Sequence, residues 1–206
     1  MLVIFDLDGT IIDTREEIEY TFRKAFENLG LEFDERRMEE SIGFAIEELI
    51  EALLGHYDAR VEEEIRRIYY GMNERKIRIF PGMERVIREN GFKKAIFTSK
   101  RRKPALRDLN YFNIVHLFDA IIGADDVKRK KPHGEGILKI MSLLNERKED
   151  TYVVGDTEMD ILAAMNAGVR SIAVTWGFRS KEFLEALNPD YIVHRPEEIL
   201  KIVKGE

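Results

Sequence analysis

The chain begins Met1-Leu-Val-Ile-Phe-Asp-Leu-Asp-Gly-Thr10, and this stretch decides the fold. Leu2 to Phe5 form an apolar run that is too short for a helix and lacks polar alternation, so it predicts a strand buried on both faces. Asp6 and Asp8 follow directly, where an unpartnered buried carboxylate would cost several kcal/mol. In an open parallel sheet, however, the carboxyl ends of the strands are where ligands bind.

Alternation along an extended chain would place Asp6 and Asp8 on the same side. Gly9 then lets the backbone leave the strand and approach a ligand closely. Two carboxylates directed at one point repel each other unless a cation or a shared proton lies between them, so the pattern predicts a metal site, a proton-transfer role, or both. The alternative is a turn in which an Asp caps a helix starting at Arg15.

The composition describes a folded globular protein with one large domain or a core with a smaller insert. Of its 206 residues, 35% are charged and 44% hydrophobic, and the net charge of −6 argues against sequence-independent nucleic-acid binding. There is no apolar stretch of membrane-spanning length and no signal peptide before the first strand, so we expect a cytoplasmic protein without a membrane partner. Cys and Gln are absent and charged residues are abundant, a composition typical of a thermophile source.

Residues 15–78 show helical periodicity throughout and predict a small all-helical insert, which we interpret as a cap domain. The first apolar stripe ends near Gly30 and the second near Gly55. The apolar residues of the three stripes are Ile18, Phe22, Ala25, Phe26 and Leu29; Ile46, Leu49, Ile50, Leu53 and Leu54; and Val61, Ile65, Ile68, Tyr69 and Met72.

Short apolar runs and helical segments alternate in the rest of the chain, which is the signature of a doubly wound parallel sheet. Together with residues 1–14, residues 79–206 therefore predict a Rossmann-like α/β core. The expected strands after the first are residues 95–98, 120–123, 151–155, 171–174 and 191–193.

Polar side chains follow several of these strands, and parallel strands would gather them at one edge of the sheet. Asp156 and Asp160, four residues apart, would share a face of the first turn of a helix. The complete set is Asp6 and Asp8, Thr98 and Ser99, Lys131, and Asp156 with Asp160.

Phosphoryl transfer suits this set. Asp6 could attack phosphorus and form an aspartyl-phosphate, which divides one difficult hydrolysis into two easier steps. Carboxylates such as Asp6 and Asp156 are the hard oxygen ligands that Mg²⁺ prefers. The Thr98 hydroxyl, the Ser99 backbone N–H and the Lys131 ammonium could hold the phosphoryl oxygens as charge shifts. Taken singly, each group has a simpler explanation as a helix cap or as solvated surface.

Four motifs resemble, in order, those of the haloacid dehalogenase-like hydrolases: DLDGT at Asp6–Thr10, IFTSK at Ile96–Lys100, KKP at Lys130–Pro132 and VGDTEMD at Val154–Asp160. The resemblance covers the whole chain, and the helical insert looks like the helical cap of that family. The segment from Val174 to Leu200 is similar to the branch of phosphoglycolate phosphatases and related small-molecule phosphatases.

The resemblance implies roles for individual residues. Asp6 would be the nucleophile, and Asp8 would protonate the leaving group and later activate water. The backbone carbonyl of Asp8 would join the carboxylates of Asp6 and Asp156 as a metal ligand. Asp160 would lie just behind the metal ligands or orient Lys131.

The implied function is Mg²⁺-dependent hydrolysis of a small, phosphoglycolate-like phosphorylated metabolite by a monomer or small homo-oligomer. Phosphoglycolate, pyrophosphate and small sugar phosphates all stay open as substrates. The alternatives are a sugar-phosphate mutase with the same chemistry and a non-catalytic binding domain. The branch usually has the pattern Lys-Pro-x-Pro, whereas here Lys131-Pro132 is followed by His133-Gly134. The next helix is therefore expected to start differently. In the cap, residues 41–44 are the segment expected to reach the substrate, unless Phe44 merely packs inside the cap.

Overall fold

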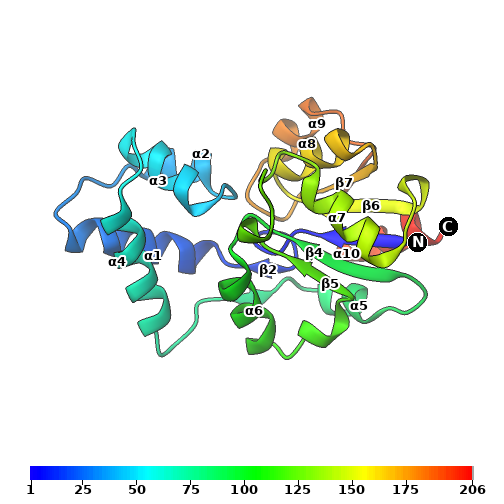
Figure 1. Ribbon diagram of the computed structural model, residues 1–206, viewed down its shortest axis with the longest axis horizontal. Coiled ribbons are helices and arrows are strands. Elements are labelled where there is room, and N and C mark those ends of the chain that lie inside the picture. The colour runs from blue at the N-terminus through cyan, green and yellow to red at the C-terminus, as the bar shows by residue number, and fades with distance from the viewer. Residues whose placement is uncertain (206) are drawn as a thin grey trace.

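The computed structural model describes residues 1–205 and has at its centre a six-stranded parallel sheet in the order β5-β4-β1-β6-β7-β8 (Figure 1). Strand β1 lies inside the sheet, with Leu2 in register with Lys93 on one side and with Thr151 on the other. The prediction of a doubly wound α/β fold is therefore confirmed. The strands are β1 (Leu2–Phe5), β4 (Lys93–Phe97), β5 (Ala120–Ile122), β6 (Thr151–Gly155), β7 (Arg170–Val174) and β8 (Tyr191–Val193).

Both faces of the sheet are covered, which explains why β1 is apolar at every position. Val3 and Phe5 belong to the core formed with α5, α6 and α10, whereas Leu2 and Ile4 belong to the core formed with α7 and α8. A further small cluster joins α9 to α8 and β7. The helix bounds are α5 (Met83–Arg88), α6 (Arg102–Tyr111), α7 (Glu135–Leu144), α8 (Glu158–Ala167), α9 (Lys181–Ala186) and α10 (Pro196–Lys204).

The chain runs outward from β1 in two directions, first through β4 to β5 and then back through β6 and β7 to β8. In open α/β sheets, ligands bind beyond the carboxyl ends of the strands at the point where the strand order reverses. The topology therefore predicts a ligand site beside the residues that follow β1, β4 and β6.

Four helices between β1 and β4 form a separate group, to the left of the sheet in Figure 1, with an apolar cluster of their own. They are α1 (Arg15–Asn28), α2 (Glu35–Ser41), α3 (Ile46–Leu54) and α4 (Ala59–Gly71). We refer to α1–α4 as the cap helices; that residues 15–78 form a domain that moves as one body stays a prediction. Among residues 1–205, no helix is both long enough and apolar enough to cross a membrane.

The sequence patterns missed three features around the cap. Helix α2 buries only Met38 and Ser41 and therefore has no apolar stripe to detect. Residues 72–77 are not helical, because α4 ends at Gly71 and Met72 adopts an extended conformation. Beyond them, β2 (Ile12–Asp13) pairs antiparallel with β3 (Arg78–Ile79) and ties together the two crossings between core and cap.

Gly136 offers a test of the packing between α7 and the sheet. A Cβ at this position would clash with the ring of Phe97, which is buried in the core. We expect Gly136→Ala to lower the free energy of unfolding by about 1–3 kcal/mol, as overpacking does. The matched control is Gly71→Ala at the end of α4, where no atom lies within 4 Å of the new methyl group, and this change should be neutral or stabilising by up to about 1 kcal/mol. Chemical denaturation of both variants checks the prediction, and equal effects would contradict it.

Candidate active site

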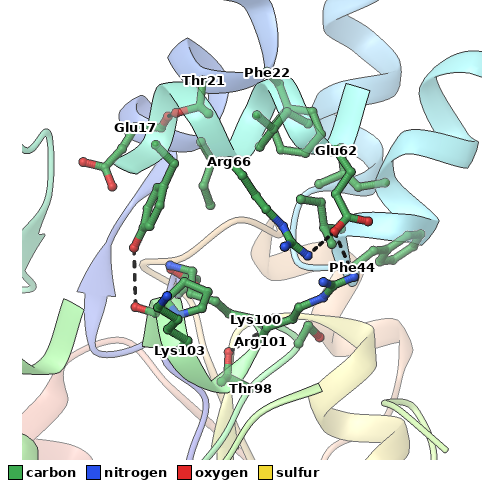
Figure 2. A pocket seen from close by; sticks show the side chains of 18 of the residues that line it. Glu17, Thr21, Phe22, Phe44, Glu62, Arg66, Thr98, Lys100, Arg101 and Lys103 are labelled. Carbon is green, nitrogen blue, oxygen red and sulfur yellow. Dashed lines mark hydrogen bonds and ion pairs between the residues drawn. The ribbon is translucent and has the colours of Figure 1, made fainter. Parts of the chain in front are cut away.

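The structure brings the predicted polar residues together at the carboxyl end of the sheet. Asp6 and Asp8 follow β1, Thr98 follows β4, and Asp156 follows β6. Asp6, Asp8 and Thr98 line the floor of a cavity of about 340 Å³ whose roof is formed by the cap helices. Figure 2 shows this cavity, with Thr98 on the core side and Phe44 on the cap side.

Lys131 is buried between two carboxylates. Its Nζ lies 2.7 Å from Asp6 Oδ1 and 2.5 Å from Asp160 Oδ1. The other Asp160 oxygen accepts hydrogen bonds from the Thr157 backbone N–H at 3.1 Å and from the Thr157 hydroxyl at 2.8 Å. Asp160 is thus held by the start of α8 and in turn orients the Lys131 ammonium toward Asp6. Orienting Lys131 is one of the two roles that the resemblance implies for Asp160.

The loop after Lys131 departs from the Lys-Pro-x-Pro pattern, and the structure shows how the next helix begins without the second proline. The His133 Nδ1 accepts a hydrogen bond from the Glu135 backbone N–H at 3.1 Å. Gly134 precedes α7 and lies against Ala167 of α8, where a Cβ would be too close to the Ala167 backbone. The start of α7 is therefore fixed by the His133 side chain and by close packing against α8.

Asp156 is fixed from both sides. The Thr10 hydroxyl donates to its Oδ1 at 2.8 Å, and the Phe178 backbone N–H donates to its Oδ2 at 2.7 Å. Gly9 and Gly177 touch the same carboxylate so closely that neither position has room for a Cβ, and Gly9 has a φ of +81°. The glycine in the first motif is therefore required both by its backbone conformation and by this contact.

Three carboxylates crowd around this point. Asp6, Asp156 and Asp160 are buried, and each has an oxygen within 4.8 Å of the others. Burial raises the pKa of Asp6 well above its ordinary range even though Lys131 opposes the shift, and burial together with Asp160 raises the pKa of Asp156 to about 7. With all three ionised, Lys131 leaves two negative charges uncompensated. Clustered carboxylate oxygens are what a hard divalent cation such as Mg²⁺ requires, so the residues fit that ion.

Asp8 faces a different cation. Lys100 Nζ lies 2.6 Å from Asp8 Oδ1 and 2.6 Å from Asp108 Oδ2. Lys100 belongs to the second motif, but neither of its ion pairs was predicted. Its second partner, Asp108, lies on α6 without any motif around it. Thr98 supports the same turn, since its hydroxyl accepts a hydrogen bond from the Lys100 backbone N–H at 3.1 Å. Ser99 is half-buried and lines the cavity.

A buried ionic network continues from Asp108 into the cap. Arg75 lies 2.5 Å from Asp108 Oδ1 and forms a two-pronged pair with Glu17 of α1, with Nε at 2.8 Å and Nη2 at 2.6 Å. The Tyr69 hydroxyl of α4 donates to Asp108 at 2.6 Å. The network therefore joins α1, the end of α4 and the segment returning to the core with α6 and, through Lys100, with Asp8.

Arg75→Met tests this network. It leaves the buried carboxylates of Glu17 and Asp108 without their shared cation, so we expect the free energy of unfolding to fall by about 3–5 kcal/mol. The control is Arg78→Met, which breaks an ion pair with Asp13 in which the arginine side chain is 77% exposed, against 4% for Arg75. An exposed pair contributes about 0–1 kcal/mol. Urea titrations measure both, and a small effect at Arg75 would show that the network is not needed for stability.

The cap contacts the core at residues 41–44, the segment predicted to reach the substrate; that it does so stays a prediction. Gly43 has a φ of +101°, and a Cβ there would approach Thr157 Cγ2 to 2.8 Å. Phe44 is half-buried and lines the cavity beside this contact (Figure 2). Arg179, which the sequence did not single out, donates to the backbone carbonyls of Glu39 and Glu40 at 3.3 and 2.9 Å. These contacts hold the loop after α2 over the site.

The buried carboxylates and lysine below a cavity form a candidate active site on an α/β fold. The chain belongs to the haloacid dehalogenase-like hydrolase family, which it matches over residues 3–174. The predicted family and the prediction of a hydrolase are thereby confirmed.

Three relatives illustrate the similarity. Pyrophosphatase PpaX of Halalkalibacterium halodurans is 33% identical over 98% of this chain and 95% of its own. Phosphoglycolate phosphatase of Aquifex aeolicus is 30% identical over 98% of this chain and 96% of its own. The solved structure of a haloacid dehalogenase-like family hydrolase of Streptococcus pneumoniae matches the fold with a TM-score of 0.83 at 28% identity, covering 98% of this chain and 97% of that one.

Proposed function

We propose that this protein is a Mg²⁺-dependent phosphomonoester hydrolase that acts on a small phosphorylated metabolite through an aspartyl-phosphate intermediate. The observation that carries the proposal is the placement of Asp6. Its carboxylate lies on the cavity floor, 2.7 Å from a buried lysine and within a cluster of carboxylates that fits a divalent cation. The names of the two curated relatives support a phosphate compound as substrate.

In the first step, an Asp6 oxygen attacks phosphorus and the bond from phosphorus to the ester oxygen breaks. Asp8, which lines the same cavity, donates a proton to the departing oxygen, so the alcohol leaves neutral. Lys131, the Thr98 hydroxyl and the Ser99 backbone N–H are the groups proposed to hold the phosphoryl oxygens as charge shifts.

In the second step, water attacks the phosphorus of the aspartyl-phosphate and gives its proton to Asp8. The bond between phosphorus and the Asp6 oxygen breaks, inorganic phosphate leaves, and Asp6 is regenerated. The cap helices above the cavity would limit the access of bulk water to the aspartyl-phosphate while the alcohol departs.

The carboxylates of Asp6 and Asp156 and the backbone carbonyl of Asp8 are the proposed ligands of Mg²⁺. Bound there, the ion would supply positive charge that offsets the repulsion between the carboxylates and an anionic substrate. Asp160 has both oxygens occupied, by Lys131 and by Thr157, so we assign it to the positioning of Lys131.

Asp6→Asn tests the nucleophile. The change is nearly isosteric, and Lys131 keeps Asp160 as a partner, so the fold should persist. We expect kcat to fall at least 10³-fold, which corresponds to about 4 kcal/mol of barrier. The control is Asp13→Asn, a carboxylate that pairs with Arg78 outside the cavity, and it should keep the wild-type rate. Steady-state release of phosphate measures both, and a near-normal rate for Asp6→Asn would refute the mechanism.

Removal of the metal is a separate test. Chelation should abolish hydrolysis and Mg²⁺ should restore it, whereas Ca²⁺ should restore little because it prefers larger, looser coordination. Asp156→Ala should raise the Mg²⁺ concentration needed for half-maximal rate by about tenfold or more, because a charged ligand is lost. A chelated enzyme that keeps its rate would contradict the assignment. When the enzyme is mixed with a bisphosphorylated hexose, transfer of one phosphoryl group to Asp6 and back to the bound sugar monophosphate, instead of to water, would favour the mutase alternative.

A further inference from the structure

The cavity above Asp6 carries information about the leaving group. The phosphoryl group itself is expected to bind at the floor, near Lys131 and Thr98, so the rest of the cavity is available to the alcohol. At about 340 Å³ the space lies near the lower end of the range typical of small-molecule sites. It is large enough for a ring with a short linker.

The cap side of the cavity is mainly apolar. Its walls carry apolar side chains from α1, α3, α4 and the loop before α3, of which Phe22 and Phe44 are labelled in Figure 2. These side chains are Ile18, Phe22, Phe44, Ile46, Leu49 and Ile65. Such a surface favours a ligand that removes apolar area from water.

The cations beside this wall, one from α4 and two from the core, are already paired with carboxylates of the cap helices. Arg66 lies 2.5 Å from Glu62, and Arg101 lies 2.9 Å from the same residue (Figure 2). Glu47 of α3 pairs with Arg101 and, at 2.7 Å, with Lys130. Burial alone would raise the pKa of Glu47, but the hydrogen bonds from Lys130 and Arg101 outweigh it and hold the pKa at about 2. Glu62 and Glu47 are thus both held in ion pairs with these cations.

Few positive charges are left for an anionic leaving group. Lys100 is shared between Asp8 and Asp108. Within residues 1–205, Lys103 forms no ion pair, but it is exposed at the rim, where it lies 5.4 Å from the ring of Tyr70. A carboxylate or a second phosphate entering the wall would meet Glu62 as well as its arginine partners. Such a group would gain Arg66 and Arg101 only by competing with Glu62 for them, and the apolar side chains beside them offer it no partner, so the cavity favours an uncharged leaving group.

We propose that the enzyme prefers phosphate monoesters of uncharged alcohols with an apolar body, such as a ring or a branched chain, over phosphoglycolate and inorganic pyrophosphate. The proposal rests on the proposed hydrolase function and narrows its substrate class. The reaction is the one given above: phosphorus exchanges its bond to the ester oxygen for one to Asp6 and then to water, and the products are a neutral alcohol and inorganic phosphate.

A series of alkyl phosphates, phosphoglycolate among them, tests the preference with leaving groups of similar basicity, and pyrophosphate, whose leaving group is the much less basic phosphate, is measured beside them. With Mg²⁺ present, kcat/KM is measured for methyl, butyl and benzyl phosphate, for phosphoglycolate and for pyrophosphate. We expect benzyl phosphate to exceed both methyl phosphate and phosphoglycolate by about tenfold or more, since apolar contacts of one or a few carbons give discrimination of that size. Phe44→Ala should reduce the ratio of benzyl to methyl phosphate.

Glu62→Gln tests the electrostatic part. It releases Arg66 and Arg101 from a charged partner, so the ratio of kcat/KM for phosphoglycolate to that for benzyl phosphate should rise about tenfold. A ratio measured within one variant does not depend on the fraction of folded enzyme. The control is Glu64→Gln on the same helix, whose carboxylate pairs with Arg67 on the surface, and it should leave the ratio unchanged.

The outcomes separate this inference from the function beneath it. Wild-type enzyme that prefers phosphoglycolate or pyrophosphate, or that treats methyl and benzyl phosphate alike, overturns the substrate class and leaves the hydrolase intact. An unchanged ratio in Glu62→Gln overturns the role of the paired cations. If no phosphate compound in the series is hydrolysed with Mg²⁺, the proposed function itself fails.

Discussion

The crowding of carboxylates at the end of β1 and β6 is the constraint on which the rest of the site depends. Three acidic side chains meet within 4.8 Å in a buried place, and one ammonium lies among them. Such an arrangement is costly without further positive charge. The surrounding structure is built to hold it: Thr10 and the Phe178 backbone fix Asp156, and α8 fixes Asp160.

The fold was predictable because its central strands β1 and β6 are buried on both faces. An apolar run such as Leu2–Phe5 can be recognised without periodicity, and β6 has the same character and the same acidic ending. The gathering of Asp6, Asp156 and Lys131 followed from parallel strands alone. The structure confirms that these residues meet, whereas their catalytic roles still come from the family resemblance and from chemistry.

The features that were missed depend on contacts between distant residues. Asp108 lies in an ordinary surface-like helix pattern, yet it is fully buried because Arg75, Lys100 and Tyr69 surround it. The two-residue strands β2 and β3 are too short to leave a pattern. The pairing of Glu47 and Glu62 with cations of the core also could not be foreseen, because it requires knowing where the cap lies above the sheet.

Ion pairs connect the cap helices to the core, in addition to the two crossings of the polypeptide chain. Glu17 and Tyr69 reach the core through Arg75 and Asp108, and Glu47 reaches it through Arg101 and Lys130. A cap that moves as a body would have to break or rearrange these pairs. The ionic contacts therefore help to hold the cap helices in the arrangement seen here, in which the apolar wall stands over Asp6.

The most direct measurement is chemical trapping of the phosphorylated residue. Enzyme mixed with Mg²⁺ and benzyl phosphate is quenched during turnover and treated with borohydride, which reduces an acyl-phosphate to the alcohol, and the modified peptide is identified by mass spectrometry. Modification of the peptide from the start of the chain, with homoserine in place of Asp6, is the predicted result. Modification at Asp8, Asp156 or any other carboxylate, or active turnover without any trapped residue, would contradict an aspartyl-phosphate at Asp6.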